Sequence, residues 1–281
     1  MSNIDFETLF DKIGLNSIRL TFGESIDSCE AGSRIGGRPL VPIGFEWPRY
    51  SGIDALGKPV DAPLALLAQI KLEETAPYDL DSKLPKCGYL LFFYELESMQ
   101  WGFDPKDAGC ARVFYFDAPA SELSPADFPS DLAPDFRIEA RSIVFESKKS
   151  IPDGEDYDEL FDDFSFDFDD YIEAAEELGI FDDDDDEPHK LLGYADIIQS
   201  SMLYECEAVT RGLNCGGSDG YSTPQADDIR LHKADWTLLA QFGTIDERIM
   251  FGDCGCIYYY IRKQDLEKRD FSRVWLILQC Y

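Results

Sequence analysis

Residues 64–71 read LALLAQIK, and the tetrapeptide LLAQ within them recurs at 238–241, inside the second apolar run WTLLAQFG at 236–243. Both runs are short, rich in aliphatic residues and bounded by turn-forming stretches, which is typical of a buried β-strand. A four-residue identity can arise by chance in a hydrophobic chain. Its weight therefore depends on whether the flanking sequence recurs as well.

Three further motifs recur in the same order around the tetrapeptide. A glycine-centred loop precedes it, a Cys-Gly pair with an apolar-aromatic run follows it, and an Arg-Val pair leads the last run. The paired motifs are IGGRP (35–39) and LLGYA (191–195), CGYLLFFY (87–94) and CGCIYYY (254–260), and RV (112–113) and RVW (273–275). The glycine-centred pair is the weakest match. Because loops tolerate the insertions that separate the motifs, the sequence predicts two copies of one β-rich unit.

The remaining pattern indicates the fold class. Strands are expected around residues 18–22 and at 64–71, 88–95, 111–117, 137–145, 236–243, 254–262 and 272–280. A first helix is expected where Phe6, Phe10 and Ile13 fall at helical spacing, with Asn3 as its cap and Gly14 at its end. Long helical patterns between the strands are few. We therefore predict an α+β protein, predominantly antiparallel β, with an internal duplication and a few short helices.

The expected boundaries follow from these runs. Residues 1–14 form an N-terminal helix, 15–150 the first β-rich repeat, 151–188 an acidic-aromatic connecting segment and 189–281 the second repeat. Each repeat alone would expose strand edges, and pairing the repeats would cover some of them. We expect both repeats to form one compact domain.

The charge of the chain excludes several partners. With 56 acidic and 25 basic side chains, the formal net charge is −31, which opposes binding to nucleic acid and to anionic membranes. The opening MSNIDFETLF has no basic stretch followed by an apolar one, so we expect no secretory signal and a cytoplasmic location. A basic protein partner would suit the charge, but keeping the chain soluble is the simpler interpretation.

Eight cysteines are scattered through the chain, and its two histidines are His189 and His232. Mostly free, buried thiols in a reducing compartment are the simplest interpretation. Cys254 and Cys256 would share one face of a regular strand, but two thiols are too few for a closed zinc site. Neither histidine has a nucleophile motif beside it, and a Cys-His site at Cys215 is the weaker alternative, so we interpret both histidines as surface residues. We predict no metal and no cofactor.

Residues 151–188 hold 19 Asp and Glu and no Lys or Arg. Aromatic residues interrupt the acids in FDDFSFDFDDY (161–171), and five aspartates follow at 182–186. Charge steers a basic partner and aromatic side chains anchor it. On this hypothesis, the partner-binding residues are Phe164, Phe166, Phe168, Asp182, Asp183 and Asp184. The alternative, which we favour for this segment, packs the aromatics on the repeat cores and leaves the acids in water. The carboxylates do not follow the spacing of a calcium-binding loop.

Together the motifs resemble the YwqG-like proteins, the DUF1963 family. The resemblance runs from about residue 30 to the C-terminus, and it rests also on SRIGGRPLVPIGFEWP (33–48), LLGYADIIQ (191–199) and the closing stretch FGDCGCIYYYIRKQDLEKRDFSRVWLILQCY (251–281). It implies a bacterial, two-fold-repeated α+β protein of unassigned function, with toxin-immunity or other protein-interaction roles in some members. It implies no catalytic residues. Ala195 departs from the family, where a Pro is common.

Two functions follow as expectations. The preferred one is a cytoplasmic, non-enzymatic protein-binding module of the toxin-immunity kind, with its acidic surface against a basic partner. The alternative is an enzyme or small-molecule-binding protein with its site in the groove between the repeats. Polar residues at the repeated loops and strands are the groove candidates: Arg34, Gln69, Gln241, Asp253 and Arg273. Internal hydrogen bonds at these side chains would instead indicate a scaffold role.

Overall fold

The computed structural model describes residues 5–54, 56–161, 166–181, 188–246 and 248–281. Within these ranges, ten strands form one antiparallel sheet, accompanied by two small two-stranded sheets and seven α-helices. The predicted α+β class with predominant antiparallel pairing is therefore confirmed. No helix in the described ranges combines the length and the apolar character needed to cross a membrane.

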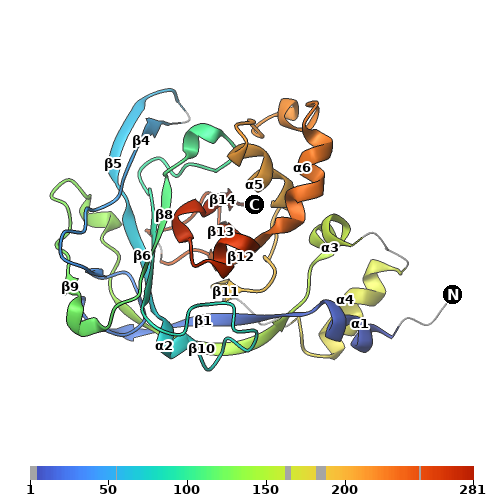
Figure 1. Cartoon of the computed structure of the whole chain (residues 1–281), viewed down its shortest axis with the longest axis horizontal. Coiled ribbons are helices and arrows are strands. Elements are labelled where there is room, and N and C mark those ends of the chain that lie inside the picture. Colours follow the sequence, from blue (N-terminus) through green and yellow to red (C-terminus); the bar gives the residue numbers. More distant parts are fainter. Residues whose placement is uncertain (1–4, 55, 162–165, 182–187, 247) are drawn as a thin grey trace.

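The large sheet curls into a nearly closed barrel. Its strands, in spatial order, are β14 (Trp275–Gln279), β13 (Cys256–Arg262), β12 (Trp236–Phe242), β11 (Lys190–Leu192), β1 (Leu15–Ser25), β10 (Arg141–Ser150), β2 (Arg34–Ile35), β6 (Ala65–Lys71), β7 (Tyr89–Tyr94) and β8 (Ala111–Phe116). In Figure 1 the sheet passes from β12 in the centre, through β1 and β10 along the lower edge, to β6 and β8 on the left. The order makes β1 and β10 the central pair.

The loop between β7 and β8 meets the far edge strand. The Leu278 amide of β14 donates to the Trp101 carbonyl at 3.0 Å, and the Trp275 indole donates to the Gly102 carbonyl at 2.8 Å. Gly102 has φ of +84°, and a Cβ there would lie 1.9 Å from the Leu276 carbonyl oxygen. Glycine is therefore required for this approach, which brings the two ends of the sheet together.

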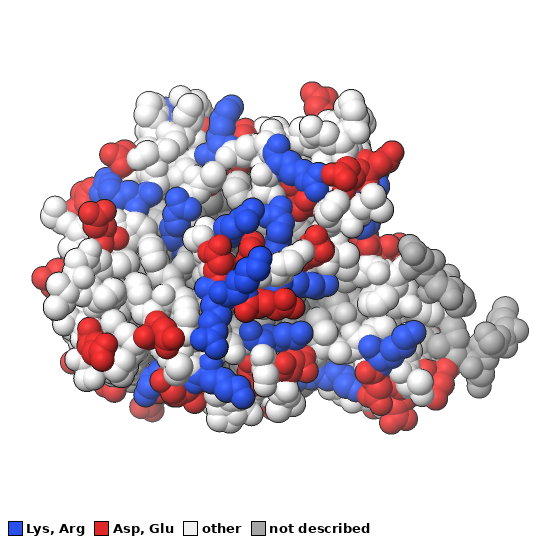
Figure 2. All heavy atoms as spheres, in the orientation of Figure 1, with Lys and Arg blue, Asp and Glu red and all other residues white. Residues whose placement is uncertain are grey.

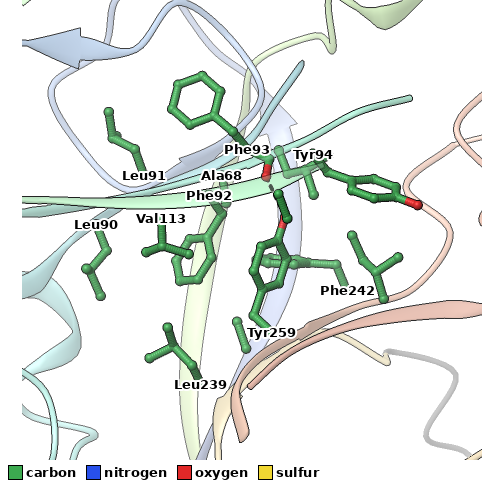
Figure 3. Packing of buried hydrophobic residues seen from close by; sticks show 14 of the residues in the cluster. Ala68, Leu90, Leu91, Phe92, Phe93, Tyr94, Val113, Leu239, Phe242 and Tyr259 are labelled. Atoms are coloured by element: carbon green, nitrogen blue, oxygen red, sulfur yellow. Dashed lines mark hydrogen bonds between the residues drawn. The ribbon is translucent and has the colours of Figure 1, made fainter. Parts of the chain in front are cut away.

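The interior of the curl is filled by apolar side chains from both ends of the sheet. Phe92 of β7 lies edge-on to Tyr259 of β13 and to Phe242 of β12, with ring centroids 5.3 and 5.5 Å apart, and all three rings are fully buried. The Tyr259 hydroxyl donates to the Phe93 carbonyl at 3.1 Å, as Figure 3 shows. Because edge-to-face aromatic pairs contribute about 0.5–1.5 kcal/mol beyond their burial, this cluster ties β7 to β12 and β13.

Helices α1 (Phe6–Ile13), α3 (Gly154–Leu160) and α4 (Phe168–Glu177) form a separate aromatic cluster at the right of Figure 1. Tyr171 is fully buried there, 4.9 Å from the Phe10 ring, 5.4 Å from Phe166 and 5.3 Å from Phe168 between centroids. The aromatics of the acidic segment thus pack on the N-terminal helix, not on the sheet core as expected. The first helix is capped by Asp5, which accepts from the Thr8 amide, whereas Asn3, the cap expected from the sequence, lies outside the described residues.

The other elements surround the sheet. Helices α5 (Leu203–Thr210) and α6 (Ala226–His232) pack against each other and α5 contacts β12 and β14, while the two smaller sheets lie on the opposite side of Figure 1. The remaining elements are α2 (Leu72–Thr75), α7 (Lys263–Glu267), β3 (Leu40–Val41), β4 (Arg49–Ile53), β5 (Pro59–Pro63) and β9 (Ser124–Pro125). The strand expected at 137–145 begins at Arg141, because the Ile138 carbonyl accepts from the Gly37 amide of the neighbouring loop.

The repeated motifs occupy corresponding strands. The tetrapeptide LLAQ lies in β6 and in β12, and the pairing of each with the next strand is interrupted at the same place, between Leu66 and Ala68 and between Leu238 and Ala240. The glycine-centred motifs follow β2 and β11. Their backbones turn with φ of +61° and +74° at residues 36 and 37 and φ of +61° and +75° at residues 192 and 193.

Each tetrapeptide ends in a buried glutamine that holds the glycine-centred loop. Gln69 accepts from the Leu40 amide at 2.9 Å and donates to the Gly32 carbonyl at 3.1 Å. Gln241 accepts from the Asp196 amide at 2.9 Å and donates to the Pro188 carbonyl at 3.0 Å. Both glutamines are fully buried, so each satisfies two backbone groups that strand pairing leaves open.

Replacing either glutamine by methionine should destabilise the fold by a similar amount. Gln69→Met and Gln241→Met each keep the side-chain volume but leave one amide and one carbonyl without a partner, which we expect to cost about 2 kcal/mol or more of unfolding free energy. Urea unfolding measures the loss. Gln264→Met, at an exposed position of α7, is the control and should change stability by less than about 0.5 kcal/mol. A loss confined to one of the buried pair would contradict the equivalence of the two loops.

Candidate functional site

The groove candidates chosen from the sequence do not meet in one place. Arg34 is fully buried and donates to the backbone carbonyls of its own loop, and Gln69 and Gln241 hold the two glycine-centred loops. Asp253 is exposed in a turn, and the Arg273 side chain is 60% exposed beside Asp265. Three of the five therefore satisfy backbone groups, and the other two lie apart on the surface.

The partner-binding candidates divide in the same way. Phe166 and Phe168 are half-buried against Tyr171 in the α1–α4 cluster. Phe164, Asp182, Asp183 and Asp184 lie outside the described residues. In the described part of the acidic segment, the rings face inward and most carboxylates are exposed, but Asp156 is buried.

A cavity of about 770 Å³ opens where α3, α7 and strands β12 and β13 meet the start of β1. We call it the α3–α7 cavity. Its walls come from α3 and its end, from the loop after β11, from α5, β12 and β13, and from α7 with the facing loop 81–85. All parts of the chain thus contribute to it: the first β-rich region, the connecting segment and the second β-rich region.

A buried carboxyl group lines this cavity. Asp156 is 2% exposed and lies in the first turn of α3, where its amide donates to the capping carboxylate of Asp153 at 2.9 Å. Its own carboxylate accepts from the Ser201 hydroxyl at 2.7 Å. Within the described ranges this is its one side-chain hydrogen bond, and no Lys or Arg forms an ion pair with it. A buried carboxylate with so few partners is unusual, because burying an unpaired charge is costly.

Tyr260 of β13 lines the same cavity and has a hydroxyl without a partner. The residue is 1% exposed, and its Oη forms no hydrogen bond to any described residue. Buried tyrosine hydroxyls usually find a partner. An unpaired one in a residue that lines the same cavity as a buried carboxyl group is one sign of a binding site in the described part of the chain.

The environment perturbs the titration of these groups. Burial raises the pKa of Asp156 to about 7, and Asp153 and Glu159 raise it further, while Ser201 and Lys190 oppose the shift. Burial raises the pKa of Tyr260 well above its ordinary value, and the Asp156 charge adds to this. Burial also raises the pKa of Tyr194 to about 12, again with a contribution from Asp156. Asp156 is therefore close enough to both tyrosines to interact with them electrostatically.

Aromatic walls around Asp156 are held in place by their own hydrogen bonds. The Trp236 indole donates to Glu207 at 2.8 Å, and the Arg262 guanidinium lies 4.3 Å from its ring centroid. The Tyr194 hydroxyl donates to the Ile13 carbonyl at 2.8 Å. Because these contacts fix the side chains without any ligand, the cavity is largely preformed.

The mouth of the α3–α7 cavity carries Lys83, Lys263 and Arg269, together with Asp81 and Glu267. Figure 2 shows Lys and Arg side chains gathered in a stripe over α7 and the chain beside α2, on the face seen in Figure 1. Lys263 donates to the Ala234 carbonyl at 2.7 Å, and burial lowers its pKa, with a further lowering from Lys83.

Hydrogen bonds at the start of β1 position the facing loop. The Asn16 amide donates to Asp81 at 3.0 Å, and its side-chain oxygen accepts from the Leu80 amide at 2.9 Å. Asp79 accepts from the amides of Lys83 and Leu84 at 3.0 and 2.8 Å. These contacts place Lys83 at the mouth of the cavity.

A second hollow of about 810 Å³ lies beside β1 and β10. Its cations have partners: Lys190 pairs with Asp196 at 2.5 Å, and Arg141 donates to the carbonyls of Phe22 and Gly23. Its lining includes Phe181 and Pro188, and the residues between them lie outside the described ranges. This hollow therefore offers a weaker argument for binding.

His189 lies in the wall of this second hollow and is not the surface residue that we expected. It is 4% exposed, its ring stacks on Phe22 with centroids 4.0 Å apart, and its Nδ1 accepts from the Gly243 amide. Burial lowers its pKa to about 4. His189 is thus a neutral core residue that lies directly before β11. His232, by contrast, is exposed at the end of α6.

The cysteines are all free, and most are buried. Cys254 is exposed in a turn with φ of +50°, whereas Cys256 is buried in β13, so the two do not share the face of a regular strand. Among the described residues, no group of three or more His, Cys, Asp or Glu side chains is arranged to hold a metal ion.

The raised pKa of Asp156 should make the stability of the protein depend on pH. A folded-state pKa of about 7 lies above the unfolded value of about 3.9, so the folded state holds a proton that the unfolded chain releases. This contribution is fully present below about pH 4 and is lost as the pH rises through 7. Asp156→Asn removes it. We therefore expect the unfolding free energy of the variant, relative to wild type, to rise by about 2 kcal/mol between pH 5.5 and 8.5.

Urea unfolding of both proteins across this range provides the measurement. The opposite contribution of His189, lost as the pH falls from about 6.5 toward its folded pKa of about 4, is common to both proteins and cancels. Asp158→Asn, at an exposed position of the same helix, should show no such change. A difference between Asp156→Asn and wild type that does not vary with pH would contradict the assigned environment.

Comparison with known proteins gives a family but no activity. A family model described as "Domain of unknown function (DUF1963)" matches residues 33–280, so the chain belongs to this family. No curated protein matches the sequence.

Proposed function

We propose that this DUF1963 protein binds a small organic molecule in the α3–α7 cavity. The observation that carries the proposal is the buried carboxyl group of Asp156, which lines this cavity and has one side-chain hydrogen bond in the described ranges. Burying a carboxyl group with so few partners is costly. A ligand that bonds to this group offsets that cost.

The size and lining of the cavity support the same proposal. Its volume of about 770 Å³ falls in the range of roughly 300–1,000 Å³ that small-molecule sites occupy. Its lining combines the apolar and aromatic side chains of Leu203, Trp236 and Leu238 with the polar groups of Asp156 and Tyr260 and the charged residues of the mouth. The cavity lies between the two β-rich regions. This position favours the alternative expected from the sequence, a small-molecule-binding protein with its site in a groove. The residues that line the cavity, Asp156 and Tyr260 among them, differ from the five groove candidates.

The acidic docking surface for a basic partner has less support. That hypothesis requires aromatic side chains that can anchor a partner. Phe166 and Phe168 instead pack in the α1–α4 cluster. The carboxylates of α4 that face water, among them Asp169, Asp170 and Glu173, are exposed. Charge alone steers a partner but supplies little affinity without buried anchors.

We also propose that the strands β1, β2, β6, β7 and β8 and the strands β10 to β14 arose by duplication of one unit, so that β10 belongs to the second copy. The strand order supports this, because β1, β11, β12, β13 and β14 on one side mirror β10, β2, β6, β7 and β8 on the other. The registers agree as well. Leu191 pairs with Ile18, and Ile35 pairs with Arg141.

A two-fold axis that carries Leu191 onto Ile35 therefore carries Ile18 onto Arg141. Counting three residues along each strand, the same axis carries Thr21 onto Val144. These two residues are themselves directly paired, so the axis passes between them and relates β1 to β10. In an experimental structure, rotation about this axis should bring β6 and β7 onto β12 and β13. Failure of these strands to superimpose would exclude duplication.

Binding in the cavity can be tested with indole as a neutral aromatic probe. Saturation-transfer NMR should show contact between indole and the wild-type protein, because the apolar walls around Trp236 fit a flat ring. Leu203→Phe narrows the cavity and should reduce the transfer severalfold. Leu231→Phe, at a position 79% exposed on α6, is the matched control and should have no effect.

Two outcomes would contradict binding in this cavity. One is the absence of transfer to indole in the wild-type protein, and the other is unchanged transfer in a folded Leu203→Phe variant. If circular dichroism shows that Leu203→Phe does not fold, amide chemical shifts of the wild type replace it. Indole must then move the amides of Tyr194, Ser201 and Tyr260 more than those of α4, and the reverse pattern would overturn the assignment.

A further inference from the structure

We propose that the ligand of the α3–α7 cavity is an amine with an acidic group at its far end. Its ammonium group lies against Asp156 and the rings of Trp236 and Tyr260, and its anionic group lies at the mouth against Lys83, Lys263 and Arg269. This inference rests on the proposed function and names the chemical class of the ligand.

The inner end of the cavity is suited to a cation. Asp156 is almost completely buried, and within the described ranges it has one side-chain hydrogen bond, from Ser201, and no ion pair. Buried carboxylates are normally paired with a cation or neutralised by a proton. An ammonium group supplies the missing positive charge and up to three donors.

The aromatic wall favours the same group. The faces of tryptophan and tyrosine rings attract cations, and the attraction is stronger where water is excluded. The Trp236 ring already contacts one cation, because the Arg262 guanidinium lies 4.3 Å from its ring centroid. Trp236, Tyr260 and Asp156 all line the cavity. Carboxylate and rings together form a site for an ammonium ion.

The outer end is suited to an anion. Three of the cations of a chain with net charge −31 meet at this mouth. Burial lowers the pKa of Lys263, Asp235 opposes this shift and Lys83 adds to it, so the ammonium groups of Lys83 and Lys263 repel each other. A bound carboxylate or phosphate between them would relieve this repulsion. Asp81 and Glu267 at the same mouth offset part of the positive charge.

The two ends together select a zwitterion. An amine without an acidic group would have to pass the three cations, and an acid without an amine would gain nothing from Asp156. Discrimination of this kind combines attraction at the correct end with repulsion at the wrong one. The body that joins the two charges must be apolar, because Leu203 and Leu238 line the walls between them.

Four probes of one shape separate these contributions. They are para-(aminomethyl)phenylacetate, which has both charges; para-methylbenzylamine, which has the ammonium; para-methylphenylacetate, which has the carboxylate; and para-xylene, which has neither. Titration calorimetry at pH 8 and low salt should rank the zwitterion first. Loss of the ammonium group should weaken binding by about tenfold or more, as expected for a charged hydrogen bond in a buried site.

Variants assign each end. Asp156→Asn should weaken the zwitterion and the amine by about tenfold or more and leave the acid unchanged. The double variant Lys83→Met with Arg269→Met should weaken the zwitterion and the acid, and leave the amine unchanged. Asp158→Asn removes the same charge from the exposed face of α3 and should alter none of the four.

The pH dependence provides an independent check. Amine binding requires the charged form of Asp156, so in wild type it should weaken by about tenfold per pH unit below 7, and in Asp156→Asn it should not. The groups that act on Asp156 or are acted on by it are Asp153 and Glu159 at α3, Lys190 of β11, Tyr194, Cys206 of α5 and Tyr260 of β13. Burial raises the pKa of Tyr194 to about 12 and places the pKa values of Cys206 and Tyr260 well above their ordinary values.

The results distinguish the two proposals. If none of the four probes binds, including para-xylene, the proposed binding function is wrong. If para-xylene or the acid binds as tightly as the zwitterion, the cavity binds ligands but the ammonium assignment is overturned. If the amine and the zwitterion bind equally, the anionic end is overturned. Equal effects of Asp156→Asn and Asp158→Asn would likewise overturn the role of Asp156.

Discussion

The antiparallel ladder between β1 and β10 is the constraint on which the rest of the structure depends. It runs from Leu15 opposite Ser150 to Ser25 opposite Arg141 and joins strands that are distant in the sequence. On one side β1 pairs with β11, and on the other β10 pairs with β2. All other strands of the large sheet follow outward from these pairs, and the Phe92, Phe242 and Tyr259 contacts then join the two arms across the interior.

The same central pair positions the α3–α7 cavity. Leu15 and Asn16, at the start of β1, form part of its wall and hold the loop that carries Lys83. The chain leaves β10 directly into α3, which brings Asp156 to the cavity. Keeping a buried carboxyl group and an unpaired hydroxyl here lowers stability. Sites that violate the ordinary rules of polar burial in this way are most often the ones that bind or react.

Sequence reasoning recovered the long strands and missed the short ones. The apolar runs of β6, β7, β12 and β13 are long enough to show their burial, whereas β2 and β11 span two and three residues and carry no periodic signal. The polar residues nominated for a groove were chosen because they recur. Gln69 and Gln241 recur because the two loops that they hold are alike, which is a structural reason. Asp156 lies outside the repeated motifs, and Tyr260 lies in one only as part of an apolar-aromatic strand, so no pattern in the sequence pointed to either as a site residue.

Apolar runs, glycines and charge in the sequence by themselves determined the fold class, the positions of the main strands along the chain, the family and the strongly acidic character. These properties depend on residues near one another along the chain, because burial of a strand or the turn at a glycine is a local requirement. The tertiary structure alone decided which polar groups are satisfied and which are not. A hydrogen-bond partner, a desolvated carboxyl group or a cavity wall depends on atoms contributed by segments far apart in sequence, such as those that carry Asp156, Ser201 and Tyr260.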